Sequence, residues 1–477
     1  GSLQRTLRLF RLQEMARLAV RDLTGRANLQ EVMATLTALA EACLHHSLVA
    51  AMTQTAQRFG LTPETLGLAP VIIGMGKLGA GELNYSSDVD LIYLFRPDSS
   101  SIGSPPATVV AQYLFTLVTR AMAEVTEDGL VFRVDSNLRP GGKDGAQAQS
   151  LESARKHYLA LGQPWERLAL LKARPVAGDL AAGRELLTDL SPFIFRRHLD
   201  YTSLEELKAR FSRDKWSKVA KPTAFGRPLP AFSTVDVKVS PGGIRQVEFF
   251  VQALILTFGG RLPHLRESTT LGALTALARE KIIDQTDQEA LTRAYIFLRT
   301  VEHRIQLREL TQTQTLPRAR EAREAIARSL GFTGKESGNS WLDFFKLLSH
   351  FMNQVKTRFD LVLAEPDEGQ RAAAALADRN PLDWAVNLLD HLDDNESALE
   401  LLGQAGFKRP AAALAACRNI HQEKYLPGQL ARYGAHLERL MPTMIATMVR
   451  TMDPDRAILH LERFMRSIGP KAGFLLL

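Results

Sequence analysis

The 477-residue chain is long enough for about three domains, and its 45% apolar and 23% charged residues are ordinary for a globular protein. No apolar run approaches the roughly 18 residues that a membrane span requires, and no signal peptide is visible, so we expect no membrane segment. The net charge of +7 permits nucleic acid or phosphate-bearing partners, and it equally fits an ordinary basic protein.

The first residues and the cysteines bear on the origin and location of the chain. Gly1 and Ser2 stand in place of Met, which is typical of a sequence left by removal of a tag, so we expect part of a longer protein. Cys43 and Cys417 lie far apart, and neither has the spacing of a metal ligand. Such cysteine usage is typical of a reducing compartment, and we expect a cytoplasmic protein.

In chain order, a helical N-terminal region gives way to a short stretch of strands. Apolar residues three and four apart predict helices over residues 3–60, with Gly25 and Gly60 as stops. From Pro70, short apolar runs predict strands, with a helix near 111–125 before the last of them. The predicted strands are PVIIG (70–74), VDLIYLF (89–95) and LVFRVDSNLRP (130–140).

After about Tyr158 the pattern is helical again. One further strand-like run, STVDVKVS (233–240), leads through two glycines into a long helix over 241–260. Residues 268–365 and 372–477 are also predicted as mainly helical. We therefore predict an α+β fold, in which a small mixed sheet with helices is embedded in a predominantly helical chain with helical-bundle domains. The predicted domains are 1–200, 201–365 and 366–477.

The segment GMGKLG (74–79) fits the glycine pattern of a dinucleotide-binding loop, but its context does not. Only residues 80–88 separate it from the next predicted strand, whereas a crossover to a parallel strand requires about 10–12 residues. A phosphate-binding P-loop is also excluded, because Lys77 is followed by Leu78 instead of Ser or Thr. The glycines are instead expected to let backbone N–H groups approach a phosphate.

Two aspartates begin the strand that follows the glycines. Strand alternation puts Asp88 and Asp90 on one face, with Cα atoms roughly 6.5–7 Å apart, and directs Val89 and Leu91 to the other face. This separation suits two carboxylates that share a pair of divalent ions. The alternative is that these aspartates are turn residues and the glycines a plain loop.

A third carboxylate is expected from the next predicted strand. There Val131, Arg133 and Asp135 share one face, whereas Phe132 and Val134 point into the core. Three converging carboxylates repel one another unless a cation is present. Oxygen ligands and phosphate chemistry favour Mg²⁺, with Mn²⁺ as the alternative.

These motifs resemble a known family. Gly76, Asp88 and Asp90 have the spacing of polymerase β-type nucleotidyltransferases, and GMGKLGAGELNYSSDVDLIYLF resembles the bifunctional glutamine synthetase adenylyltransferase/adenylyl-removing enzymes. The resemblance continues through VDSNLRP, WERLALLKAR, FRRHLD, GGIRQVEF and TQTQTLP, and so covers essentially the whole chain. The forms LNYSSDVD, FRRHLD and GGIRQVEF resemble the N-terminal, adenylyl-removing half followed by a helical linker domain.

Basic and polar residues around the aspartates complete the predicted site. WERLALLKARPVAGD (165–179) is predicted as a helix, and its basic residues could form a solvated face, whereas the resemblance favours Lys172 and Arg174 as phosphate contacts. Arg139 lies just past Asp135 and could reach the same site, or it could bond a loop carbonyl. The resemblance implies that Arg245 and Glu248 belong to the site, and the alternative is a surface ion pair. The full predicted binding set is Gly74, Gly76, Lys77, Ser86, Ser87, Arg139, Lys172, Arg174, Arg245 and Glu248.

The resemblance implies an activity and partners. It implies phosphorolytic removal of AMP from a tyrosine of glutamine synthetase, with phosphate consumed and ADP released. It also implies regulation by the PII signal protein and cooperation with a second catalytic half. The alternatives are the reverse transfer of AMP from ATP, or a catalytically silent regulatory module. Nucleic acid is disfavoured as a partner, because no aromatic platform for stacking bases stands out.

Overall fold

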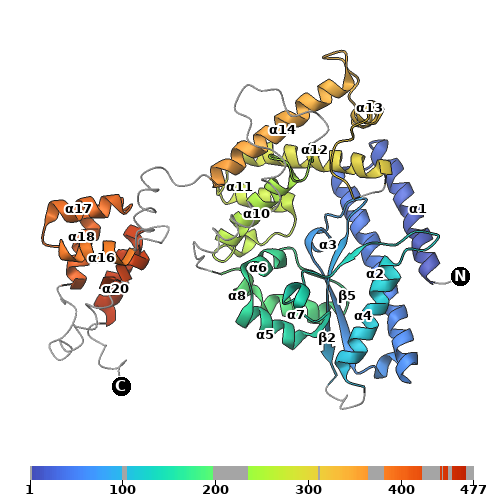
Figure 1. Ribbon diagram of the computed structural model, residues 1–477, viewed down its shortest axis with the longest axis horizontal. Coiled ribbons are helices and arrows are strands. Elements are labelled where there is room, and N and C mark those ends of the chain that lie inside the picture. The colour runs from blue at the N-terminus through green and yellow to red at the C-terminus, as the bar shows by residue number, and fades with distance from the viewer. Residues whose placement is uncertain are drawn as a thin grey trace. The chain divides into compact units, whose positions relative to one another are not determined.

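The computed structural model describes residues 3–98, 105–196, 235–309, 312–363, 381–421, 441–442, 444–448 and 454–468 (Figure 1). The chain divides into two compact units, Gly1–Val362 and Leu363–Leu477. The first unit contains the sheet and the helices around it, and the second is helical where it is described. The three-domain division stays a prediction.

Two long helices open the first unit, as predicted. They are α1 (Leu3–Leu23) and α2 (Leu29–Phe59). The side chain of Asn28 caps the start of α2, and Gly60 ends it with a φ of 68°, a conformation that suits glycine. By length and composition α2 could cross a membrane, which the sequence interpretation did not anticipate. The evidence for a span is weak, since 56% of its apolar window is buried inside the protein, as in a core helix.

The sheet is built around two antiparallel strands, β1 (Leu68–Gly74) and β2 (Val89–Pro97). The short helix α3 (Gly76–Ala80) lies between them in the chain. Strand β5 (Arg174–Gly178) pairs antiparallel with β1, whereas β3 (Val134–Asp135) and β4 (Ala148–Ser150) pair parallel with β2. Because β1 and β2 are antiparallel, the exclusion of a dinucleotide-binding crossover is confirmed.

Three local predictions differ from the structure. The predicted strand 130–140 is reduced to β3, because the N–H groups of Val131 and Phe132 both bond to the carbonyl of Met122. Val131 is consequently buried beside Phe132, and its predicted placement on the face of Asp135 is wrong. The described part of 233–240 is a turn, since the Asp236 side chain accepts the N–H groups of the second and third residues after it.

The predicted helix over 165–179 is also wrong in its second half. Helix α6 (Pro164–Leu170) is followed by a turn and then by β5, which was not predicted. Pro175 lies in this edge strand next to a register shift, a position where strands tolerate proline. Arg167 is buried and donates to the carbonyl of Ile194, so it does not lie on a solvated basic face.

The remaining described α-helices fill in both units. In the first unit they are α4 (Ala107–Ala123), α5 (Leu151–Leu161), α7 (Leu180–Asp189), α8 (Ser191–Ile194), α10 (Ile244–Phe258), α11 (Thr270–Arg279), α12 (Gln285–Glu309), α13 (Arg320–Ser329) and α14 (Ser340–Leu363). In the second unit they are α16 (Pro381–Asp390), α17 (Asn395–Gln404), α18 (Pro410–His421) and α20 (Pro454–Ile468).

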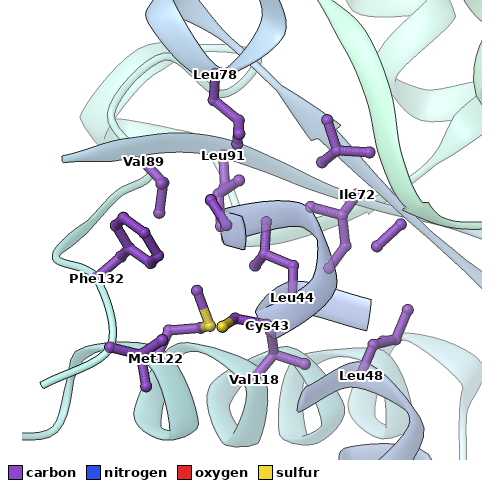
Figure 2. Packing of buried hydrophobic residues seen from close by; sticks show 14 of the residues in the cluster. Cys43, Leu44, Leu48, Ile72, Leu78, Val89, Leu91, Val118, Met122 and Phe132 are labelled. Carbon is purple, nitrogen blue, oxygen red and sulfur yellow. The ribbon is translucent and has the colours of Figure 1, made fainter. Parts of the chain in front are cut away.

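One face of the sheet packs on α2 and α4 (Figure 2). Leu44 of α2 and Val118 of α4 meet Val89 and Leu91 of β2 in this core, all of them nearly inaccessible to solvent. Burying such side chains is the main stabilising term of the fold, at about 25 cal/mol per Å² of apolar surface. Since Val89 and Leu91 point into the core, strand alternation leaves Asp90 on the opposite face, as predicted.

Candidate active site

The glycine turn packs directly against the second strand. Gly76 has a φ of 52°, and a Cβ atom there would lie 2.7 Å from Oδ2 of Asp90. A Cβ at Gly79 would lie 1.8 Å from the carbonyl oxygen of Lys172. The N–H of Met75 also donates to the carbonyl of Asp90 at 2.8 Å. The glycines are therefore required for close approach, and they place backbone groups beside the aspartate.

Two of the three predicted carboxylates are neighbours on adjacent strands. Asp90 of β2 and Asp135 of β3 are paired in register, and Asp88 immediately precedes β2. Burial, and then the negative charges of Asp135 and Asp88, raise the pKa of Asp90 to about 7. A carboxyl group in this condition is half protonated near neutral pH, and a bound cation would favour its ionised form.

Asp88 is engaged by other side chains. Its Oδ1 lies 2.5 Å from Nε of Arg133, and its Oδ2 accepts from Nε2 of Gln312 at 2.8 Å. Arg133 also donates to the carbonyl and hydroxyl oxygens of Ser86. Across the described ranges, no three His, Cys, Asp or Glu side chains gather closely enough to hold a metal ion. The three carboxylates and the raised pKa of Asp90 fit Mg²⁺ chemically. Metal binding by all three aspartates stays a prediction, because the described side chains do not converge into a three-ligand site.

Lys77 extends from the glycine turn toward α12. Its ammonium lies 3.3 Å and 3.5 Å from the two carboxylate oxygens of Glu302. Burial lowers the pKa of Lys77 to about 8, and the charge of Glu302 opposes this shift. Ser86 donates its backbone N–H to Gln306 of α12, and the hydroxyl of Ser87 accepts from a nearby backbone N–H.

Lys172 lies in a buried charge cluster instead of an open basic face. Its Nζ is 3.0 Å from Glu82 and 3.7 Å from Glu248 of α10. Burial opposes ionisation of Glu248, but the positive charges of Lys172 and Lys77 dominate and lower its pKa to about 2. Glu248 was predicted for the site on the basis of the family resemblance, and the structure brings it to Lys172.

The predicted arginines have mainly structural contacts. Arg139 donates to the carbonyl oxygens of Ser136, Lys143 and Gly145, which is the loop alternative considered from the sequence. Arg174 donates to the carbonyl of Gly79 in α3 and forms an ion pair with Glu41 of α2. Arg245 lies in the first turn of α10, and its backbone N–H, which is not part of the guanidinium, donates to the carbonyl of Lys238 at 3.0 Å.

Several residues at the site were missed from the sequence. They are Glu82, Asn84, Arg299, Glu302, Gln306 and Gln312, all of which contact predicted site residues or the loop that carries them. Most lie more than 200 residues from their partners, so no local spacing could reveal the contacts. Glu82 and Asn84 lie in the quoted segment GMGKLGAGELNYSSDVDLIYLF, and Gln312 lies in the quoted connector TQTQTLP, but none of these residues was named for the site.

The sheet, the glycine turn and the paired aspartates define a module of the polymerase β-like nucleotidyltransferase class, joined to a helical region. Residues 1–188 match the family described as glutamate-ammonia ligase adenylyltransferase, and residues 213–363 match the family described as GlnD PII-uridylyltransferase. The match over residues 1–188 and the curated relatives confirm the resemblance of the chain to the bifunctional glutamine synthetase adenylyltransferase/adenylyl-removing enzymes.

Curated relatives extend the likeness over almost the whole chain. The chain is 34% identical to a protein from Nitrosococcus oceani over 99% of its own length and 47% of that protein. It is 36% identical to one from Xanthobacter autotrophicus (99% and 46%) and 33% identical to one from Pseudomonas aeruginosa (100% and 47%). All three are named bifunctional glutamine synthetase adenylyltransferase/adenylyl-removing enzyme. The chain spans about half the length of these relatives.

Proposed function

We propose that this chain removes AMP from a tyrosine of adenylylated glutamine synthetase by phosphorolysis. The observation that carries the proposal is the pairing of Asp90 with Asp135 beside the glycine turn. Its support is the name shared by the relatives, which includes both adenylyl transfer and adenylyl removal. Removal is preferred to transfer because LNYSSDVD and GGIRQVEF resemble the adenylyl-removing half of the bifunctional enzymes. The third such motif, FRRHLD, extends beyond the described residues.

The reaction transfers an adenylyl group between two oxygens. An oxygen of inorganic phosphate attacks the phosphorus of AMP-tyrosine, the bond from phosphorus to the tyrosyl oxygen breaks, and ADP and tyrosine result. The tyrosyl oxygen is a tolerable leaving group, since the pKa of free tyrosine is near 10. Asp88, Asp90 and Asp135 would hold Mg²⁺ or Mn²⁺, which supplies charge neutralisation at the phosphoryl oxygens and the leaving oxygen.

The chain's own groups bind and orient the anions. Lys77 supplies a positive charge beside the carboxylates, and its pKa of about 8 leaves it mostly protonated at pH 7. The glycine turn brings backbone groups close to Asp90 without side-chain obstruction. These groups offset the repulsion between phosphate and the adenylyl phosphate, which is the main barrier to bringing the two together.

Two other functions compete with this one. The same carboxylates would serve AMP transfer from ATP to the tyrosine, and only the half-specific motifs disfavour it. A silent regulatory module would not require Asp90 and Asp135 to be paired. We further propose glutamine synthetase as protein substrate, the PII signal protein as regulator and a second catalytic half as partner. Cys43 and Cys417 are free and buried, which suits the proposed cytoplasmic location.

The test incubates the protein with adenylylated glutamine synthetase, Mg²⁺ and phosphate, and follows nucleotides by chromatography. We expect phosphate-dependent ADP that disappears in the Asp88→Asn/Asp90→Asn double variant. Asp144→Asn is the matched control and should retain activity, because Asp144 is the exposed last residue of a short 3-10 helix, Gly142–Asp144. Labelling of unmodified glutamine synthetase by ATP, without ADP release, would assign the transferase direction. Failure of both assays would count against the removase proposal and favour the regulatory module.

A further inference from the structure

A cluster of six buried charges joins the glycine turn to α10 and α12. Its members form two groups of ion pairs at 3.0–3.7 Å, and Arg299 joins the groups by donating to the backbone carbonyl of Glu82 at 2.7 Å. The first group is Lys77, Arg299 and Glu302, and the second is Glu82, Lys172 and Glu248. None of these side chains is more than 16% exposed. Buried ion pairs add little net stability, because desolvation offsets their attraction, so the cluster is better explained as fixing geometry.

Glu302 lies between two cations of the cluster. Its carboxylate contacts Nζ of Lys77 on one side and Nε of Arg299 at 3.3 Å on the other. Arg299 is itself held by the hydroxyl of Tyr295 at 2.7 Å and the carbonyl of Glu82 at 2.7 Å. Glu302 is fully buried, so it cannot touch a substrate and acts only through its neighbours.

The same helix holds other predicted site residues. One turn after Glu302, Gln306 accepts the N–H of Ser86 at 2.9 Å. In the segment that follows α12, Gln312 donates to Asp88. A single stretch of chain thus holds a lysine, a serine and an aspartate that come from the loop between β1 and β2.

We infer that Glu302 is a positioning residue, which holds the ammonium of Lys77 beside Asp90 for contact with the phosphate of the substrate. This inference rests on the proposed function. Besides Glu302, the charges that act on Lys77 are Arg299, Lys238, Glu248 and Asp90. Because burial and the two cations favour neutral Lys77, the charge of Glu302 keeps it protonated near neutral pH as well as in place.

The test compares the unaltered protein with Glu302→Gln. Reaction of Lys77 with an amine reagent across pH, read by mass spectrometry, reports its pKa. Calorimetric titration with inorganic phosphate and Mg²⁺ reports the anion site. We expect the pKa of Lys77 to fall from about 8 by roughly 1, so that phosphate binding at pH 7.5 weakens about threefold or more. At pH 6.5 Lys77 is mostly protonated in both proteins, so the difference in phosphate affinity between Glu302→Gln and the unaltered protein should narrow.

Asp287→Asn on the same helix is the matched control, because it breaks the surface ion pair with Arg358 at 2.7 Å and should change neither readout. Unchanged Lys77 reactivity in folded Glu302→Gln overturns the inference. If that variant does not fold, Glu302→Asp, which keeps the charge but withdraws it, must still alter Lys77 reactivity, and no change there overturns the inference too. Absence of phosphate binding by the unaltered protein overturns the inference. A lower pKa of Lys77 and weaker phosphate binding in Glu302→Gln, in a protein that releases no ADP from adenylylated glutamine synthetase, support the inference and refute the proposed function.

Discussion

Replacing Asp90 by Asn should stabilise the metal-free protein at alkaline pH, although it removes a predicted catalytic group. The folded protein holds the pKa of Asp90 at about 7, against an ordinary value of 3.8. Each tenfold change in proton affinity corresponds to about 1.4 kcal/mol, so ionised Asp90 costs at most about 4 kcal/mol above pH 7. Since the carboxyl group is partly accessible to water, a stabilisation of about 1–3 kcal/mol is expected.

The direction of the pH dependence follows from linkage. A pKa raised in the folded state means that the folded protein binds more protons between pH 4 and pH 7 than the unfolded chain does. The contribution of Asp90 to stability is therefore complete below pH 3.8 and is lost as the pH rises through 7. Asp90→Asn lacks this slope, so its advantage over the unaltered protein should grow from pH 5 to pH 8.

Urea unfolding at pH 5 and pH 8, with a chelator present, measures the effect. Asp144→Asn is the control, because this exposed aspartate ends a short 3-10 helix after β3 and should change stability little at either pH. A difference between Asp90→Asn and the unaltered protein that is the same at both pH values would refute the reasoning. So would a less stable Asp90→Asn protein at pH 8. Added Mg²⁺ should stabilise the unaltered protein and Asp144→Asn more than Asp90→Asn, by mass action on the folded state.

Two further substitutions test the neighbourhood of the carboxylates. Arg133→Gln removes the cation that lies 2.5 Å from Asp88 and that would compete with a metal ion for this carboxylate. Mn²⁺ should therefore bind the variant several-fold more tightly. Equal or weaker Mn²⁺ binding by calorimetry would show that Arg133 does not compete with the metal. Gly79→Ala places a Cβ 1.8 Å from the carbonyl of Lys172 and 2.4 Å from that of Gly74, both rigid backbone atoms. It should destabilise by more than ~3 kcal/mol in urea unfolding, and a loss below about 1 kcal/mol would show that the turn can move aside.

The orientation of Asp90 on its strand was predictable because it depends on local alternation. Val89 and Leu91 had to enter the core, so Asp90 had to face away, and the structure agrees. Asp135 was expected from a neighbouring strand, and the structure pairs it in register with Asp90 across the parallel strands β2 and β3, a direction that the sequence did not predict. Errors arose where a local polar contact replaced a strand, as in the turn held by Asp236.

The contacts that organise the site were not predictable, because they join parts of the chain far apart in sequence. Lys77 and Glu302 are separated by 225 residues, and Ser86 and Gln306 by 220. A buried glutamate on a helix has no local pattern that distinguishes it from a solvated one. The basic residues show the converse difficulty: Arg139 looked available for phosphate, but its guanidinium bonds three carbonyl oxygens of its own loop.

The positions of the core and of the polar cluster explain how one strand can serve both stability and chemistry. One face of β2 is fixed by apolar packing on α2 and α4, which is insensitive to charge. The segment before this strand is fixed by α12 through an ion pair, which depends on protonation, and a hydrogen bond to Gln306, which depends on the alignment of a distant helix. Because a shift of one ångström suffices to spoil catalytic alignment, α12 can alter the site without disturbing the core that supports the sheet.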